Sequence, residues 1–172
     1  MRSLLAFVGF LLLAAFASPA SHFADAQEHT YNNTKLNYSV DFPSATWRLV
    51  GEPDDIHQHA EFVYGDRNDG YLRIRKETLP EGSTMEDFAR GDQSARFLPG
   101  YVDGKSESFD GRLDGFTSSY EYTQGGKQMA GRSYYLKADA HTVFVLRFTG
   151  LRDKLSRIRN QTDSIARSFR LK

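Results

Sequence analysis

The chain has 172 residues, of which 26% are charged and 13% aromatic, and its 22 basic side chains are balanced by 22 acidic ones. This balance gives no global reason to expect a nucleic-acid partner, and the lack of cysteine excludes disulfides, thiolate metal sites and thiol catalysis. The aromatic content is too high for a disordered chain, so we expect a folded domain.

The first 26 residues have the layout of a secretory signal peptide. Arg2 precedes an uncharged apolar run over residues 4–16, and small residues surround a cleavage position after Ala26. The run is shorter than the ~20 residues that a membrane span needs. We therefore predict that residues 1–26 are removed, and that the protein is exported, periplasmic or secreted, with no remaining transmembrane span.

The rest of the chain divides into a short polar segment and one domain. Residues 27–35 are mostly polar, and we predict a flexible leader there; residues 36–172 have the length of a single domain. Residues 36–42 alternate between apolar and polar side chains up to Pro43, as in a half-buried strand. The strands expected in this half are residues 36–42, 44–50, 56–64 and 71–79, with a turn over residues 65–70 between the last two.

A helix is expected after Pro80. Ser83 is the predicted N-cap, with Glu86 three residues later completing a capping box. Four strands should follow, over residues 101–109, 116–123, 127–138 and 142–149.

The last of these strands is apolar on both faces, which is typical of a central strand. A C-terminal amphipathic helix is expected over residues 151–169, because Leu155, Ile158 and Ile165 recur at helical spacing and the outer positions are basic. This order predicts an α+β fold, with a mainly antiparallel sheet of about six strands flanked by helices.

Several segments resemble the PsbP/Mog-like superfamily: YSVDFPSATW, LPEGSTMEDFA, GRSYYLKADAHTVFVLRFTG and IARSF. The resemblance covers most of residues 36–170. It implies an α/β/α sandwich without a shared catalytic apparatus; photosynthetic members assist the oxygen-evolving photosystem, and the Mog branch binds a small GTPase. By analogy we expect a non-catalytic binding or assembly-accessory protein with an envelope or lumenal protein partner, and no cofactor.

The sequence also shows no catalytic motif. It has no G-x-S-x-G elbow, no phosphate-binding P-loop and no G-x-G-x-x-G segment. The best site candidates lie in the hairpin of residues 56–79, where His57, His59 and Glu61 alternate on one face. Two histidines at this spacing with a carboxylate are potential ligands for a divalent metal such as zinc or copper.

The expected register of this hairpin weakens the metal hypothesis. Matching of the apolar faces pairs Phe62 with Leu72 and Ala60 with Ile74. The other face then sets Glu61 opposite Arg73, His59 opposite Arg75 and His57 opposite Glu77. Guanidinium groups repel a cation and compete for carboxylates, so a cross-strand charge ladder is favoured. The predicted binding residues are His57, His59, Arg73 and Arg75; a weak metal site at His57, His59 and Glu61 is the alternative.

A third hypothesis is a small-ligand binder with an aromatic cleft. Its lining would be Tyr120, Tyr122, Tyr134 and Tyr135, which lie on two adjacent predicted strands. The competing interpretation is that these tyrosines are ordinary sheet and core aromatics.

Overall fold

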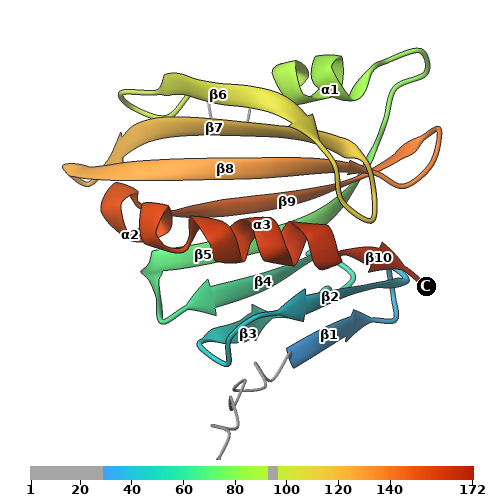
Figure 1. Cartoon of the computed structure of the whole chain (residues 1–172), viewed down its shortest axis with the longest axis horizontal. Helices are drawn as coiled ribbons and strands as arrows, with labels where there is room; N and C mark the ends of the chain where they lie inside the picture. Colours follow the sequence, from blue (N-terminus) through green and yellow to red (C-terminus); the bar gives the residue numbers. More distant parts are fainter. Residues whose placement is uncertain (1–28, 93–96) are drawn as a thin grey trace, which may run out of the picture.

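The computed structural model describes residues 29–92 and 97–172, which form two antiparallel sheets and three helices (Figure 1). The small sheet has the order β1-β2-β10 and consists of β1 (His29–Asn33), β2 (Tyr38–Phe42) and β10 (Arg170–Leu171). The large sheet has the order β3 (Trp47–Gly51), β4 (His59–Tyr64), β5 (Asp66–Thr78), β9 (Thr142–Leu151), β8 (Lys127–Lys137), β7 (Gly115–Gln124) and β6 (Val102–Phe109). The helices are α1 (Met85–Gly91), α2 (Arg152–Arg157) and α3 (Arg159–Ser168).

The predicted α+β fold is confirmed, with seven strands rather than about six in the main sheet. One face, here called the inner face, packs against α2, α3 and the small sheet. Strand alternation places Leu72, Ile74, Leu146 and Phe148 there, all fully buried. The opposite, outer face is partly covered by α1 and by Leu98 and Tyr101.

Strand β9 lies in the middle of the large sheet, between β5 and β8, as its two-sided apolar pattern predicts. Phe144 and Leu146 join the inner core, while Val143 and Val145 pack under α1 on the outer face. All four side chains are buried. Arg147 is the charged residue of this run, and its side chain lies on the outer face.

The predicted C-terminal helix is two helices that meet at Ile158, followed by the short strand β10. At the junction Ile158 reaches toward β5, where a Cβ added to Gly70 would lie 2.9 Å from Ile158 Cδ1. Leu155, Ile165 and Phe169 are buried, as the helical spacing predicted.

The prediction of a flexible leader over residues 27–35 is wrong where the structure describes it, since residues 29–33 form β1 and pair with β2. Tyr31 packs edge-on against Phe62 with ring centroids 5.0 Å apart, and the buried Asn33 donates a hydrogen bond to Tyr38 Oη at 3.3 Å. Residues 1–26, the predicted signal peptide, lie outside the described residues. Of the helices described, none has the length and apolar character needed to cross a membrane.

Helix α1 starts one residue later than its predicted capping box. Thr84 is the N-cap, and its Oγ1 accepts the Asp87 N–H at 3.0 Å. Ser83 instead donates its N–H to the Pro80 carbonyl, in a turn that includes Gly82 at φ +74°. Ser83 therefore belongs to the turn that precedes the helix and is not its N-cap.

Candidate functional site

A line of polar side chains crosses six strands on the outer face. Because neighbouring strands are in register, directly paired residues share one face of the sheet. The polar row, as we call it, consists of Glu61, Arg73, Arg147, Ser133, Ser118 and Ser106, on β4, β5, β9, β8, β7 and β6. Aromatic residues lie on both sides of it: Tyr71 and Tyr120 on one side, Tyr135 and Phe116 on the other.

A cavity of about 330 Å³ opens where the arginines of this row meet the tyrosines. We call it the arginine–tyrosine cleft; it is lined by Tyr71, Arg73, Arg75, Leu98, Tyr120, Tyr122, Val145, Arg147 and Thr149. Its volume is at the lower end of the roughly 300–1,000 Å³ typical of small-molecule sites.

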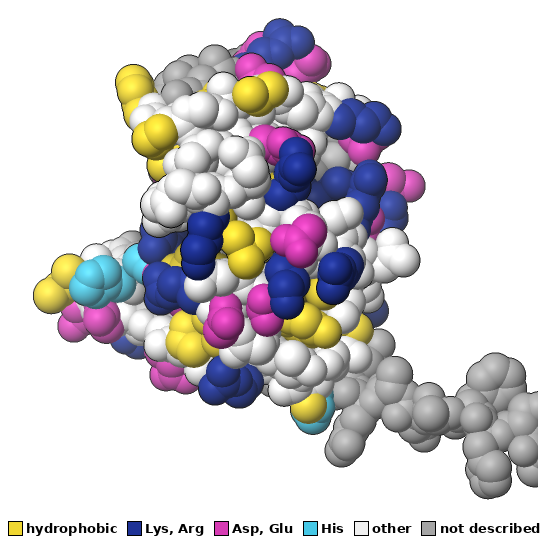
Figure 2. Space-filling view, turned by 90° about the vertical axis from the view of Figure 1, so that its left-hand side faces the viewer, with side chains coloured by type: hydrophobic (Ala, Val, Ile, Leu, Met, Phe, Trp, Pro, Cys, Tyr) yellow, Lys and Arg dark blue, Asp and Glu magenta, His cyan; other side chains and the backbone are white. Residues whose placement is uncertain are grey.

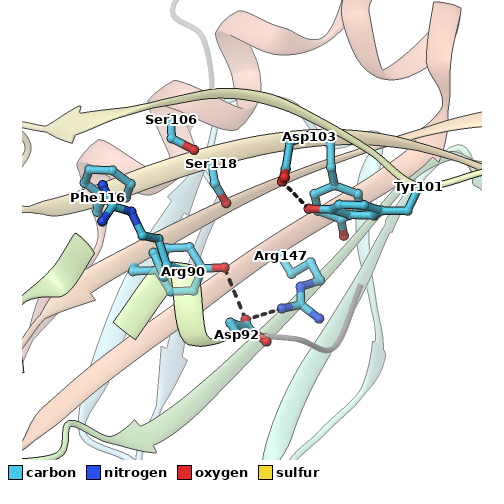
Figure 3. Close-up of a pocket in the computed structure, with 11 residues that line it drawn as sticks. Arg90, Asp92, Tyr101, Asp103, Ser106, Phe116, Ser118 and Arg147 are labelled. Carbon is cyan, nitrogen blue, oxygen red and sulfur yellow. Dashed lines mark hydrogen bonds and ion pairs between the residues drawn. The ribbon is translucent and has the colours of Figure 1, made fainter. Parts of the chain in front are cut away.

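At one end of the cleft the arginines bind the carboxylate of Asp92. Asp92 follows α1, and its side chain is only 7% exposed. Its Oδ2 accepts hydrogen bonds from Arg75 Nη2 and from the Tyr135 hydroxyl, each at 3.2 Å. It also accepts one from Arg147 Nη2, which Figure 3 shows. Two cations and a phenol, from three adjacent strands, therefore converge on a single oxygen.

Glu61 is the anchor of the other end. Arg73 donates from Nη2 to Glu61 Oε1 at 3.0 Å and to Tyr71 Oη at 3.1 Å. Arg67 and His59 also contact this carboxylate, at 3.5 and 3.0 Å. Burial alone would raise the pKa of Glu61, but hydrogen bonds from Tyr71, Arg73 and His59 outweigh it and lower the pKa below its usual value.

The structure reproduces the predicted hairpin register at four positions. Phe62 pairs with Leu72 and Ala60 with Ile74, which sets Glu61 opposite Arg73 and His59 opposite Arg75. Arg73 and Arg75 thereby line the cleft, and His59 lies beside them on β4.

The predicted pairing of His57 with Glu77 is wrong, because β4 starts only at His59. Asp54 accepts the backbone N–H groups of Ile56 and His57, at 2.8 and 2.5 Å. This local turn holds the chain away from β5, and the His57 side chain is 64% exposed.

The geometry at the two histidines offers little to a metal ion. The carboxylate of Glu61 is already bound by arginine, since Arg73 Nη2 lies 3.0 Å from its Oε1. Within residues 29–92 and 97–172 no group of three histidine or acidic side chains is arranged to hold a metal. A metal at His57, His59 and Glu61 would therefore have to rearrange this end of the hairpin.

The four tyrosines of the aromatic-cleft hypothesis separate onto two faces. Tyr120 and Tyr122 line the cleft, and Tyr135 binds Asp92 beside it. Tyr134 belongs to the inner core, where its hydroxyl contacts Thr162 Oγ1 at 3.1 Å. Burial raises the pKa of the Tyr120 phenol strongly, so it stays neutral.

Sequence reasoning missed Arg147, Asp92 and Leu98. Arg147 could have been found, because it is the one charge within the apolar run VFVLRF, where a buried strand rarely has a charge without purpose. Asp92 and Leu98 lie on the connection after α1 and reach the site only through the tertiary fold.

On the side of the molecule in Figure 2, basic and acidic side chains are interspersed, with no large patch of one sign. This agrees with the overall charge balance.

No protein-family model matches the sequence, and a search of curated proteins gives no match. Solved structures do match. LpqN of Mycobacterium tuberculosis, described as involved in cell envelope biogenesis, has a TM-score of 0.58 and 17% identity over 83% of this chain and 89% of LpqN. CyanoP, the cyanobacterial PsbP of Synechocystis sp. PCC 6803, has a TM-score of 0.59 and 15% identity over 91% of this chain and 99% of CyanoP.

Mog1 has a TM-score of 0.59 and 9% identity over 84% of this chain and 95% of Mog1. At these identities the likeness shows the fold alone. The chain has the PsbP/Mog-like fold, as the sequence motifs predicted.

Proposed function

We propose that this chain is an exported, non-catalytic binding protein that assists an envelope or lumenal component, and that it binds its ligand or partner in the arginine–tyrosine cleft. The observation that carries this proposal is the convergence of Arg73, Arg75 and Arg147 on a tyrosine-lined cavity of about 330 Å³. The apolar leader sequence and the structural likeness to an envelope-biogenesis protein support the exported setting.

The chemistry of the site favours binding over catalysis. Nucleophilic catalysis needs a hydroxyl or thiol next to a base, and in the described ranges no serine or threonine hydroxyl is hydrogen-bonded to a histidine. Guanidinium groups bind and orient anions but are poor at exchanging protons, so the arginines of the cleft suit binding.

The free-energy cost of burying arginine side chains in the cleft also supports a binding role. Arg147 and Arg75 are only 17% and 25% exposed, and removing guanidinium groups from water costs free energy that well-packed apolar residues would not. Conflicts of this kind between local stability and residue choice are typical of functional sites.

Thermal unfolding in fractionated native extract tests the proposal. We expect one fraction to raise the melting temperature of the wild type but not that of Arg73→Ala, because Arg73 is the most exposed arginine of the cleft. The control is Arg157→Ala, on α2, whose side chain is 73% exposed. An equal rise for both variants would place binding elsewhere, and the lack of any active fraction would argue against a binding protein.

A further inference from the structure

The sheet carries a ready-made receptor for a carboxylate. Arg75, Arg147 and Tyr135 come from the neighbouring strands β5, β9 and β8, and they hold the side chain of Asp92. Asp92 comes from a different part of the fold, the connection after α1. The donors therefore belong to the sheet, and the carboxylate that they hold comes from the C-terminal end of α1.

The three arginines of the cleft have hydrogen-bonding capacity left over. Arg75 uses Nη2 for Asp92 and places Nε 2.7 Å from Glu77 Oε1. Arg147 uses Nη2 for Asp92 and Nε for Ser133 Oγ at 3.3 Å.

Arg73 uses Nη2 and Nε for Glu61 and the Tyr71 hydroxyl. Among the described residues, the Nη1 group of Arg73, Arg75 and Arg147 accordingly makes no hydrogen bond. Each Nη1 has two N–H donors, and all three side chains line the cleft, so unused donors are available beside it.

Although the arginines have unused donors, most of their positive charge is already balanced by nearby carboxylates. The three guanidinium groups are matched by three carboxylates, those of Glu61, Glu77 and Asp92. Arg67, whose side chain is 65% exposed, lies 3.5 Å from Glu61 and adds one further positive charge. A phosphate dianion or a longer polyanion would find too little net positive charge to offset its own desolvation. A single carboxylate can accept paired N–H groups from a guanidinium while adding only one negative charge.

The rest of the lining suits an apolar body. Tyr71, Tyr120 and Tyr122 present aromatic surface, and Leu98 and Val145 add aliphatic surface. Tyrosines favour stacked or edge-on contact with aromatic rings. The cavity volume of about 330 Å³ limits the ligand to a small molecule.

We propose that the arginine–tyrosine cleft binds a small organic monocarboxylate, with its carboxylate on the unused Nη1 groups and an aromatic or aliphatic body against the tyrosines. This rests on the proposed function, because it names the ligand class of that same cleft.

The test is NMR-detected titration of the full chain with 3-phenylpropionate, which has one carboxylate and one ring. The matched probes are 3-phenylpropanol, which lacks the charge, and phenyl phosphate, which is a dianion. We expect 3-phenylpropionate to shift amide signals of β5 and β9 at the cleft, and to bind at least about tenfold tighter than either probe. A tenfold ratio corresponds to about 1.4 kcal/mol.

Three variants complete the design. Arg73→Ala should weaken 3-phenylpropionate binding by at least about tenfold, and Arg73→Lys should recover only part of it, because lysine keeps the charge but not the guanidinium fork. Arg157→Ala should bind like the wild type. The proposal is overturned if carboxylate and alcohol bind equally, if phenyl phosphate binds more tightly, or if no cleft amide shifts.

The two proposals fail in different ways. If native extract stabilises the wild type but not Arg73→Ala, while 3-phenylpropionate does not bind, the cleft is a binding site and only the ligand class is wrong. If no extract fraction distinguishes the variants but 3-phenylpropionate binds as expected, the carboxylate site stands and the accessory role is wrong.

Discussion

The side chain of Tyr120 lies directly against Gly131 on the neighbouring strand. A Cβ atom added at position 131 would stand 2.0 Å from Tyr120 Cζ and 2.4 Å from its hydroxyl oxygen. The two residues are direct partners between β7 and β8. The missing side chain therefore provides the space in which the tyrosine ring forms a wall of the cleft.

The first prediction is that Gly131→Ala destabilises the protein and weakens ligand binding together. Forcing Tyr120 away from its site in a packed sheet should cost about 1–3 kcal/mol in the free energy of unfolding, measured by urea denaturation. It should also weaken 3-phenylpropionate binding, since the ring must move into the cleft. Gly91→Ala is the control, because an added Cβ there finds none of the described residues within 4 Å. Wild-type stability of Gly131→Ala would contradict the packing argument.

The second prediction concerns Asp92, the C-cap of α1, whose side chain joins the end of that helix to the sheet. Asp92→Ala leaves Arg75, Arg147 and Tyr135 without their shared acceptor, which should cost about 1–3 kcal/mol in the free energy of unfolding. Asp153→Ala, by contrast, removes only an exposed ion pair, in which Asp153 Oδ2 lies 3.9 Å from Arg157 Nη2. Such a pair contributes at most about 1 kcal/mol to stability. Equal losses for the two variants in urea denaturation would show that Asp92 is not an anchor.

The sequence predicted the β4–β5 pairing because the alternation of apolar and polar side chains within one hairpin determines its register. The apolar matches of Phe62 with Leu72 and of Ala60 with Ile74 fixed the β4–β5 register, and the charged pair of Glu61 with Arg73 followed from it. The ladder prediction failed at His57, where a side-chain acceptor, Asp54, captures the backbone before it can pair.

The cleft could be predicted only in part. Arg73 and Arg75 were found because they belong to a hairpin, in which sequence neighbours become partners. Arg147 joins them through the pairing of β5 with β9, two strands far apart in the sequence, and such a pairing depends on the whole fold. Asp92, the C-cap of α1, reaches the arginines through a single side chain, a contact that leaves no periodic trace in the sequence.

The third prediction tests the start of α1. Thr84→Ala removes the acceptor for the Asp87 N–H and should cost about 1 kcal/mol in the free energy of unfolding. Ser83→Ala should change it by no more than a few tenths of a kcal/mol, because Ser83 participates in the turn only through its backbone. A larger loss for Ser83→Ala than for Thr84→Ala, in the same denaturation assay, would restore the capping box predicted from the sequence.

The fourth prediction is a pH dependence that arises at the C-terminal strand. Asp41 on β2 accepts hydrogen bonds from both Nη groups of Arg170, at 2.6 and 2.9 Å, and from Thr30 Oγ1 at 2.7 Å. The Arg170 hydrogen bond is the largest cause that holds the pKa of Asp41 below its usual value of 3.8. The stabilisation is therefore complete well above pH 3.8 and is lost as the pH falls through the lower pKa of the folded state.

Denaturation between about pH 6 and about pH 2 measures this contribution. Asp41→Asn should be less stable than the wild type at the neutral end, and the difference should shrink as the acid limit is approached. Asp55→Asn, an exposed side chain in the loop before β4, should follow the wild-type profile. A constant difference between Asp41→Asn and the wild type at every pH would mean that the charge of Asp41 contributes nothing to the contact.

The fifth prediction concerns zinc and copper at the two histidines. We expect binding weaker than micromolar, because His59 and Arg73 already share the carboxylate of Glu61 at 3.0 Å, and a metal would have to displace a cation to gain that ligand. Isothermal titration with each metal measures this, and Arg73→Ala should bind more tightly than the wild type because the competing charge is gone. Submicromolar affinity in the wild type, abolished in both His57→Ala and His59→Ala, would instead establish a metal site. It would also show that Arg73 does not prevent metal binding.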